Sequence, residues 1–120
     1  MPRRVLVVED DTPIRIMVSA VLARADFAVE TCRDVDEALP HLESQEFDAV
    51  VLAMDSSSPA RDAAMLEHLQ QADRPPCVVL LSAGPQPRLD NLASDLVRAR
   101  LRKPFDIAEL VAVVRECFPS

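Results

Sequence analysis

Acidic, hydroxyl and ammonium groups follow three of the apolar runs of this chain. They are Glu9, Asp10, Asp11, Ser82 and Lys103. Clustered carboxylates repel one another unless a cation neutralises them, and Mg²⁺ prefers such oxygen ligands. The alternative is that the acidic residues cap the following helix, where Asp11 or Thr12 would meet its positive end. The residue types therefore allow either a cation site or a capped helix.

Five apolar runs alternate with amphipathic stretches, which indicates an α/β domain with a parallel sheet. The runs cover residues 5–8, 27–31, 49–52, 77–81 and a weaker stretch around Leu101. In such a sheet, ligands collect at the carboxyl ends of the strands. The expected sheet therefore brings Glu9, residues 53–55, Ser82 and Lys103 to one edge, which favours the cation site.

Capping patterns predict where the helices begin. The predicted starts are Thr12-Pro13, with Thr12 as the N-cap, Asp34 with Glu37, Ser58-Pro59, and Asp106 with Glu109. A further helix is predicted over residues 88–97, after a loop that holds the only glycine of the chain, Gly84.

Size and charge narrow the class of protein. The 120 residues fit one domain, residues 1–120, and 49% of them are apolar. No apolar run approaches the length of a membrane span, and no signal peptide is visible. A formal net charge of −7 argues against binding to nucleic acid or to anionic membranes.

The cysteines and histidines carry no recognisable metal motif. Cys32, Cys77 and Cys117 are far apart in sequence and stand in apolar surroundings, without a CxxC pair. We expect reduced core thiols in a cytoplasmic protein. His41 and His68 stand alone in helical patterns, where a solvated face is the simplest interpretation.

These residues, in this order, resemble the receiver domain of two-component response regulators, and the resemblance spans essentially the whole chain. It implies a flavodoxin-like, doubly wound (βα)5 fold with a five-stranded parallel sheet. In receivers two adjacent acidic residues bind Mg²⁺, and Glu9 and Asp10 match them. Ser82 matches the switch hydroxyl that bonds the phosphoryl group, and Lys103 matches the lysine that pairs with its oxygens. Pro104 matches a proline whose preceding peptide bond is usually cis.

One departure from the family lies in the last strand. Receivers carry an aromatic residue three positions before the lysine, and Arg100 stands there. We expect Arg100 to point outward, because a buried arginine would need a partner. Arg98, Arg100 and Arg102 recur with a period of two, which suits an edge strand that avoids pairing. The alternative is a basic docking surface for an acidic partner.

The second departure concerns the phosphoacceptor, for which two spacings disagree. Counting forward from Glu9-Asp10 without any insertion, the expected aspartate falls on Ala53. Counting back from Pro59, by the four residues usual in receivers, it falls on Asp55. We favour Ala53, because the register of a whole strand outweighs a local helix start. Asp55 would then lie near the pocket, able to ligate a cation but poorly aimed for in-line attack.

The sequence thus favours an atypical receiver-like domain that acts as a protein-interaction module and binds Mg²⁺ weakly. The alternative is a receiver that accepts a phosphoryl group on Asp55 in a histidine-kinase phosphorelay, with Glu9, Asp10 and Asp55 around Mg²⁺ and with Ser82 and Lys103 assisting. Only this alternative includes an enzymatic step, the autophosphorylation of Asp55. The expected partners are a histidine kinase or another signalling protein, and a homodimer through the last strand and helix.

Overall fold

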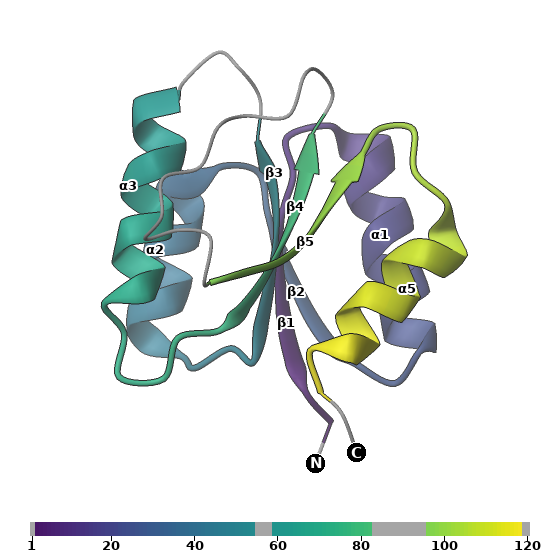
Figure 1. The fold of residues 1–120 in the computed structure, drawn as a ribbon, viewed down its shortest axis with the longest axis horizontal. Helices are drawn as coiled ribbons and strands as arrows, with labels where there is room; N and C mark the ends of the chain where they lie inside the picture. The colour runs from purple at the N-terminus through teal and green to yellow at the C-terminus, as the bar shows by residue number, and fades with distance from the viewer. Residues whose placement is uncertain (1, 55–58, 83–95, 119–120) are drawn as a thin grey trace.

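The protein is a parallel sheet with helices on both faces (Figure 1). This computed structural model describes residues 2–54, 59–82 and 96–118. The strands and helices within them are β1 (Arg4–Val8), α1 (Thr12–Arg24), β2 (Ala28–Cys32), α2 (Val35–Ser44), β3 (Ala49–Met54), α3 (Pro59–Gln70), β4 (Cys77–Ser82), β5 (Val97–Arg102) and α5 (Ile107–Glu116).

All five predicted strands are confirmed, and the second begins one residue later than expected. They form a five-stranded parallel sheet in the order β2-β1-β3-β4-β5. The sequence alternates strand and helix, and parallel neighbours need such crossovers. β1, β3 and β4 are buried along nearly their whole length, as their continuous apolar runs predict.

Side-chain caps fix the starts of three helices. Asp34 Oδ1 accepts from the backbone N–H of Glu37, and Asp106 Oδ1 accepts from that of Ala108, so both predicted caps are confirmed. The prediction of Thr12 as a cap is wrong. Asp11 is the N-cap of α1 and accepts from the backbone N–H of Ile14, while Thr12 is already helical.

The predicted helix over residues 88–97 falls largely outside the described residues, as does Ser58. Its predicted end is wrong, because Val97 is the first residue of β5. Val97 pairs with Val78 across the sheet, and strand pairing therefore overrides the helical pattern at this point.

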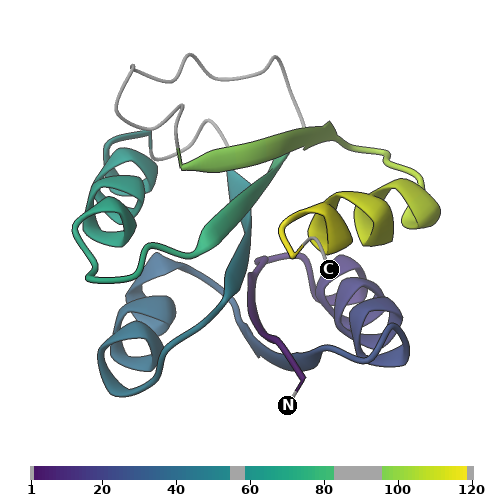
Figure 2. The ribbon, with the colours of Figure 1, turned by 60° about the horizontal axis from the view of Figure 1, so that its bottom comes forward.

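Two apolar clusters hold the layers together. Figures 1 and 2 show α1 with α5 on one face of the sheet and α2 with α3 on the other. The α1/α5 face buries Val18, Leu22, Leu110 and Val114 against alternate strand residues such as Val5 and Val7. The α2/α3 face buries Ala38, Met65 and Leu69 against the intervening residues, such as Leu6 and Val8. Successive side chains of each strand point to opposite faces of the sheet, so every strand contributes apolar residues to both clusters.

None of the helices among the described residues has the length and apolarity needed to cross a membrane.

Candidate functional site at the carboxyl edge of the sheet

The register of the sheet brings the predicted site residues to one edge. β1 pairs with β3 so that Val8 lies opposite Leu52, and the next residues along the two strands are Glu9 and Ala53. Ala53 pairs in turn with Leu81, the residue before Ser82. Because parallel strands end at the same edge, Glu9, Ala53 and Ser82 lie close together, at the upper edge of the sheet in Figure 1.

Glu9 is fully buried, with 0% of its surface exposed. Its Oε1 accepts from the backbone N–H of Asp11 at 3.1 Å, and its own backbone N–H donates to the Cys32 carbonyl at 3.1 Å. Arg15 donates from Nη1 to the Glu9 carbonyl oxygen at 2.9 Å. The backbone and side chain of Glu9 are therefore both held in a fixed geometry.

Lys103 supplies the charge that a buried carboxylate needs. Its Nζ lies 2.7 Å from Glu9 Oε2, and its side chain is only 18% exposed. Within the described residues Oε2 accepts no hydrogen bond of good geometry, so this charge contact is its main compensation. Removing either partner would leave the other charge buried and unpaired.

The backbone places Lys103 beside Ser82. β4 pairs with β5 up to Ser82 and Arg102, and the Lys103 N–H then donates to the Ser82 carbonyl at 2.7 Å. The peptide bond between Lys103 and Pro104 is cis, which confirms the prediction made from the resemblance. Ser82 is buried, with 5% exposure. The structure therefore brings together Glu9, Ser82 and Lys103, which the sequence singled out.

Residue 53 brings a methyl group to this edge. Ala53 is the fifth residue of β3 and packs on the α1/α5 face, the face to which Val5 and Val7 also belong. By strand alternation, Glu9 follows Val7 on that face, so Glu9 and Ala53 are neighbours on it. Asp55 lies outside the described residues.

The described residues of this edge do not fit a divalent cation. They contain no group of three or more His, Cys, Asp or Glu side chains arranged around a common point. Glu9 already neutralises Lys103, Asp10 is exposed, and the side chain of Ala53 has no oxygen. A hard cation such as Mg²⁺ needs several oxygen ligands, which the described residues do not supply.

Cys32 is the last residue of β2, at the same edge of the sheet, and its thiol is unreactive. It is a free cysteine with 3% exposure. Burial, together with the negative charges of Glu37 and Asp34, raises the pKa of the Cys32 thiol to about 12. The expectation of a reduced core thiol is confirmed for Cys32.

That expectation is wrong for the other two cysteines. Cys77 and Cys117 form a disulfide, although 40 residues separate them. Sequence spacing does not reveal the pairing, but the fold does. α5 starts at the carboxyl edge and runs back to the opposite edge, where β4 begins with Cys77.

The arginines of β5 occupy an edge strand, as predicted. β5 is the last strand in the order of the sheet. Arg98 and Arg102 are exposed, whereas Arg100, which was predicted to point outward, is only partly exposed. Arg98 Nη2 lies 4.0 Å from Glu116 Oε2 of α5, so part of this positive charge is balanced within the domain.

Comparison with known proteins identifies the family. Residues 5–115 match the response regulator receiver domain, so the chain belongs to that family of two-component signalling domains. No curated protein matches the chain.

Solved structures share the flavodoxin-like fold. The chemotaxis response regulator CheY4 of Vibrio cholerae is 24% identical, with 98% of this chain and 100% of that chain covered and a TM-score of 0.81. A response regulator from Thermotoga maritima is 20% identical, with 100% of both chains covered and a TM-score of 0.83. The signal receiver domain of an HD domain-containing protein from Pseudomonas fluorescens is 25% identical, with coverages of 98% and 94% and a TM-score of 0.82. The predicted fold class is therefore confirmed.

Proposed function

We propose that residues 1–120 form an atypical receiver domain that signals through protein contacts without phosphorylation of an aspartate. The observation that carries this proposal is the alanine next to Glu9 at the carboxyl edge of the sheet. Phosphoryl transfer to a receiver needs a carboxylate there as the nucleophile, and a methyl group has no atom that can attack phosphorus.

The contact between Lys103 and Glu9 supports the same function. In a phosphoryl-accepting site, Lys103 would pair with the oxygens of the phosphoryl group. In this chain its Nζ lies 2.7 Å from a fully buried carboxylate of the opposite charge. The charge of Lys103 is already paired without phosphate, so the site has no unpaired Lys103 ammonium group to draw a phosphoryl group in.

Weak Mg²⁺ binding follows from the same arrangement. Of the residues matched to metal ligands, Glu9 is committed to Lys103 and only Asp10 is exposed. Mg²⁺ would have to displace the lysine before it could use Glu9. We expect titration calorimetry to give weak binding or none, and affinity equal to that of an ordinary receiver would contradict the proposal.

The proposed partners of the domain are signalling proteins. A histidine kinase or another component of the pathway would bind the domain without transferring phosphate to it. β5 and α5 lie next to each other and carry exposed charged residues of both signs, Arg98, Arg102, Arg115 and Glu116. This surface is our proposed site for a partner or for a second copy of the chain in the cytoplasm.

The test is incubation with Mg²⁺ and acetyl phosphate, followed by intact mass measurement of the native chain and of Asp55→Ala. We expect no phosphoryl adduct on either protein. A stoichiometric adduct on the native chain that disappears in Asp55→Ala would establish the alternative, a receiver that uses Asp55.

A further inference from the structure

The disulfide between Cys77 and Cys117 joins two elements at the edge of the sheet opposite the candidate site. Cys77 is the first residue of β4, whereas Ser82 is its last. Cys117 follows α5 directly as its C-cap. Their Cα atoms are 5.9 Å apart, within the range that a disulfide spans without movement of the backbone.

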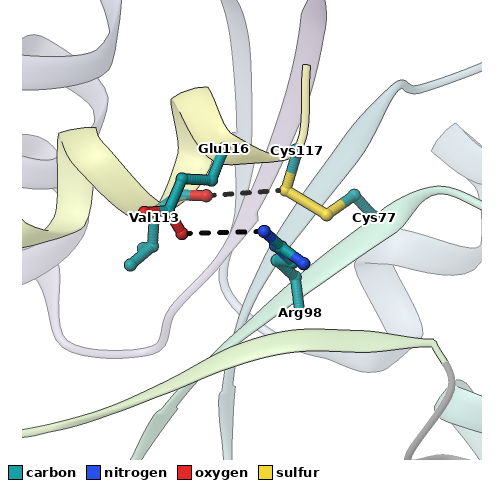
Figure 3. The surroundings of a disulfide bond; sticks show 5 residues. All are labelled: Cys77, Arg98, Val113, Glu116 and Cys117. Carbon is teal, nitrogen blue, oxygen red and sulfur yellow. Dashed lines mark hydrogen bonds and ion pairs between the residues drawn. A yellow bond between two sulfur atoms is a disulfide. The ribbon is translucent and has the colours of Figure 1, made fainter. Parts of the chain in front are cut away.

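Figure 3 shows the disulfide between Cys77 of β4 and Cys117 at the end of α5, with Arg98 and Glu116 beside it. Arg98 and Glu116 form a long ion pair at 4.0 Å, and both side chains are more than half exposed, at 54% and 58%. Phe118 packs against Phe27 with 6.1 Å between ring centroids. An exposed ion pair contributes little. Val114 also buries its side chain in the α1/α5 cluster, and the disulfide adds a covalent tie to these non-covalent contacts between the last turn of α5 and the sheet.

The two bonded cysteines differ from the third in accessibility. Cys77 and Cys117 are partly exposed at the border of the α1/α5 cluster. Cys32 is buried on the α2/α3 face and its thiol stays protonated because burial raises its pKa. Thiol chemistry is confined to one pair, and Cys32 cannot exchange with it.

From this arrangement we propose that Cys77 and Cys117 form a thiol–disulfide exchange site, through which a dithiol reductant releases the C-terminal end of α5 from the sheet. A thiolate of the reductant attacks one sulfur and the other cysteine leaves as a thiolate. The second thiol of the reductant then displaces the first cysteine and closes a cyclic disulfide. Two electrons pass to the protein, and two protons end on Cys77 and Cys117. A low-molecular-weight disulfide reverses the reaction.

This site regulates the position of α5 and is independent of the chemistry at residue 53. Opening the bond leaves the buried residues Leu110 and Val114 in place, while the turn that ends at Glu116 loses its covalent tie. Disulfides that form in a reducing compartment are typically transient and redox-sensing, which is the behaviour proposed for this pair. The surface formed by β5 and α5 would then change with the thiol redox state.

The experiment equilibrates the folded chain in buffers of reduced and oxidised dithiothreitol, followed by alkylation and intact mass measurement. We expect two alkyl groups to appear together as the buffer becomes more reducing, and a third only after denaturant is added. Hydrogen exchange at residues 113–118 should become on the order of 30-fold faster on reduction, while β1 and β3 are unchanged.

Three results would overturn the proposal. The disulfide could fail to form in the oxidised buffer, resist reduction until the chain unfolds, or open without any change in exchange at α5. Cys117→Ser should reproduce the fast exchange of the reduced chain, and Cys32→Ala should behave like the native protein. If Cys117→Ser does not fold, the native chain in the two buffers still decides the matter.

Discussion

The two ends of β4 are held by different kinds of bond. At the carboxyl end, beside Ser82, the buried ion pair of Glu9 and Lys103 occupies the place where a receiver domain performs its chemistry. At the other end Cys77 is tied covalently to α5. The described residues thus place a non-covalent charge contact at the carboxyl edge and a covalent bond at the opposite edge.

The largest effect on stability should come from breaking the ion pair. Lys103→Ala leaves the Glu9 carboxylate buried without a counter-charge, so we expect the free energy of unfolding to fall by about 4 kcal/mol. The shift of the midpoint in urea measures the loss. Arg24→Ala, which removes an exposed cation from the last turn of α1, is the matched control and should change little.

A double variant sharpens this comparison. Replacing Glu9 by Gln together with Lys103 by Met leaves no buried charge, and much of the lost stability should return. A native-like midpoint for Lys103→Ala alone would mean that the pair does not stabilise the carboxyl edge.

Opening the other end of β4 should cost less. Cys117→Ser removes a crosslink between residues 40 positions apart, and we expect a loss of about 3 kcal/mol in the free energy of unfolding. Reduction of the native chain should give a similar loss. If the oxidised and reduced chains have equal unfolding midpoints in urea, the disulfide does not stabilise the folded chain.

The smallest effect is the pH dependence contributed by Cys32. Its pKa is raised to about 12 in the folded chain because the thiol is buried. When folding raises the pKa of a group, its contribution to the free energy of unfolding is complete below the pKa of the unfolded chain. That contribution is lost as the pH rises toward the pKa of the folded chain. Between pH 8 and pH 10 the oxidised native chain should therefore lose roughly 1 kcal/mol more than Cys32→Ala. Parallel pH profiles for the two proteins would contradict the burial of this thiol.

Much of this architecture could be predicted from the sequence. The runs at residues 5–8, 49–52 and 77–81 are continuous and apolar, so their place inside a parallel sheet follows from simple patterning. The caps Asp34 and Asp106 were also predictable, because the side chains of the types that cap best stand directly before apolar helices. Thr12 was a wrong choice because Asp11, next to it, is an equally good cap.

The bonds that distinguish the two edges could not be predicted in the same way. The sequence brings Glu9 and Lys103 to one edge, but the 2.7 Å contact between them depends on the conformations of two side chains, which the spacing of residues does not specify. The disulfide depends on the return of α5 to the start of β4, which is a property of the whole topology. The length of the last helix was the available signal, because a helix that runs back along a parallel strand ends near the start of that strand.

Phosphoryl uptake by the native chain and by Ala53→Asp, measured side by side by intact mass with Mg²⁺ and acetyl phosphate, tests directly whether the alanine at residue 53 prevents phosphorylation. The aspartate would stand beside Glu9 and compete for Lys103, which restores both a nucleophile and a ligand at the carboxyl edge. We predict one phosphoryl group on Ala53→Asp and none on the native chain. A stoichiometric phosphoryl group on the native chain would contradict the account.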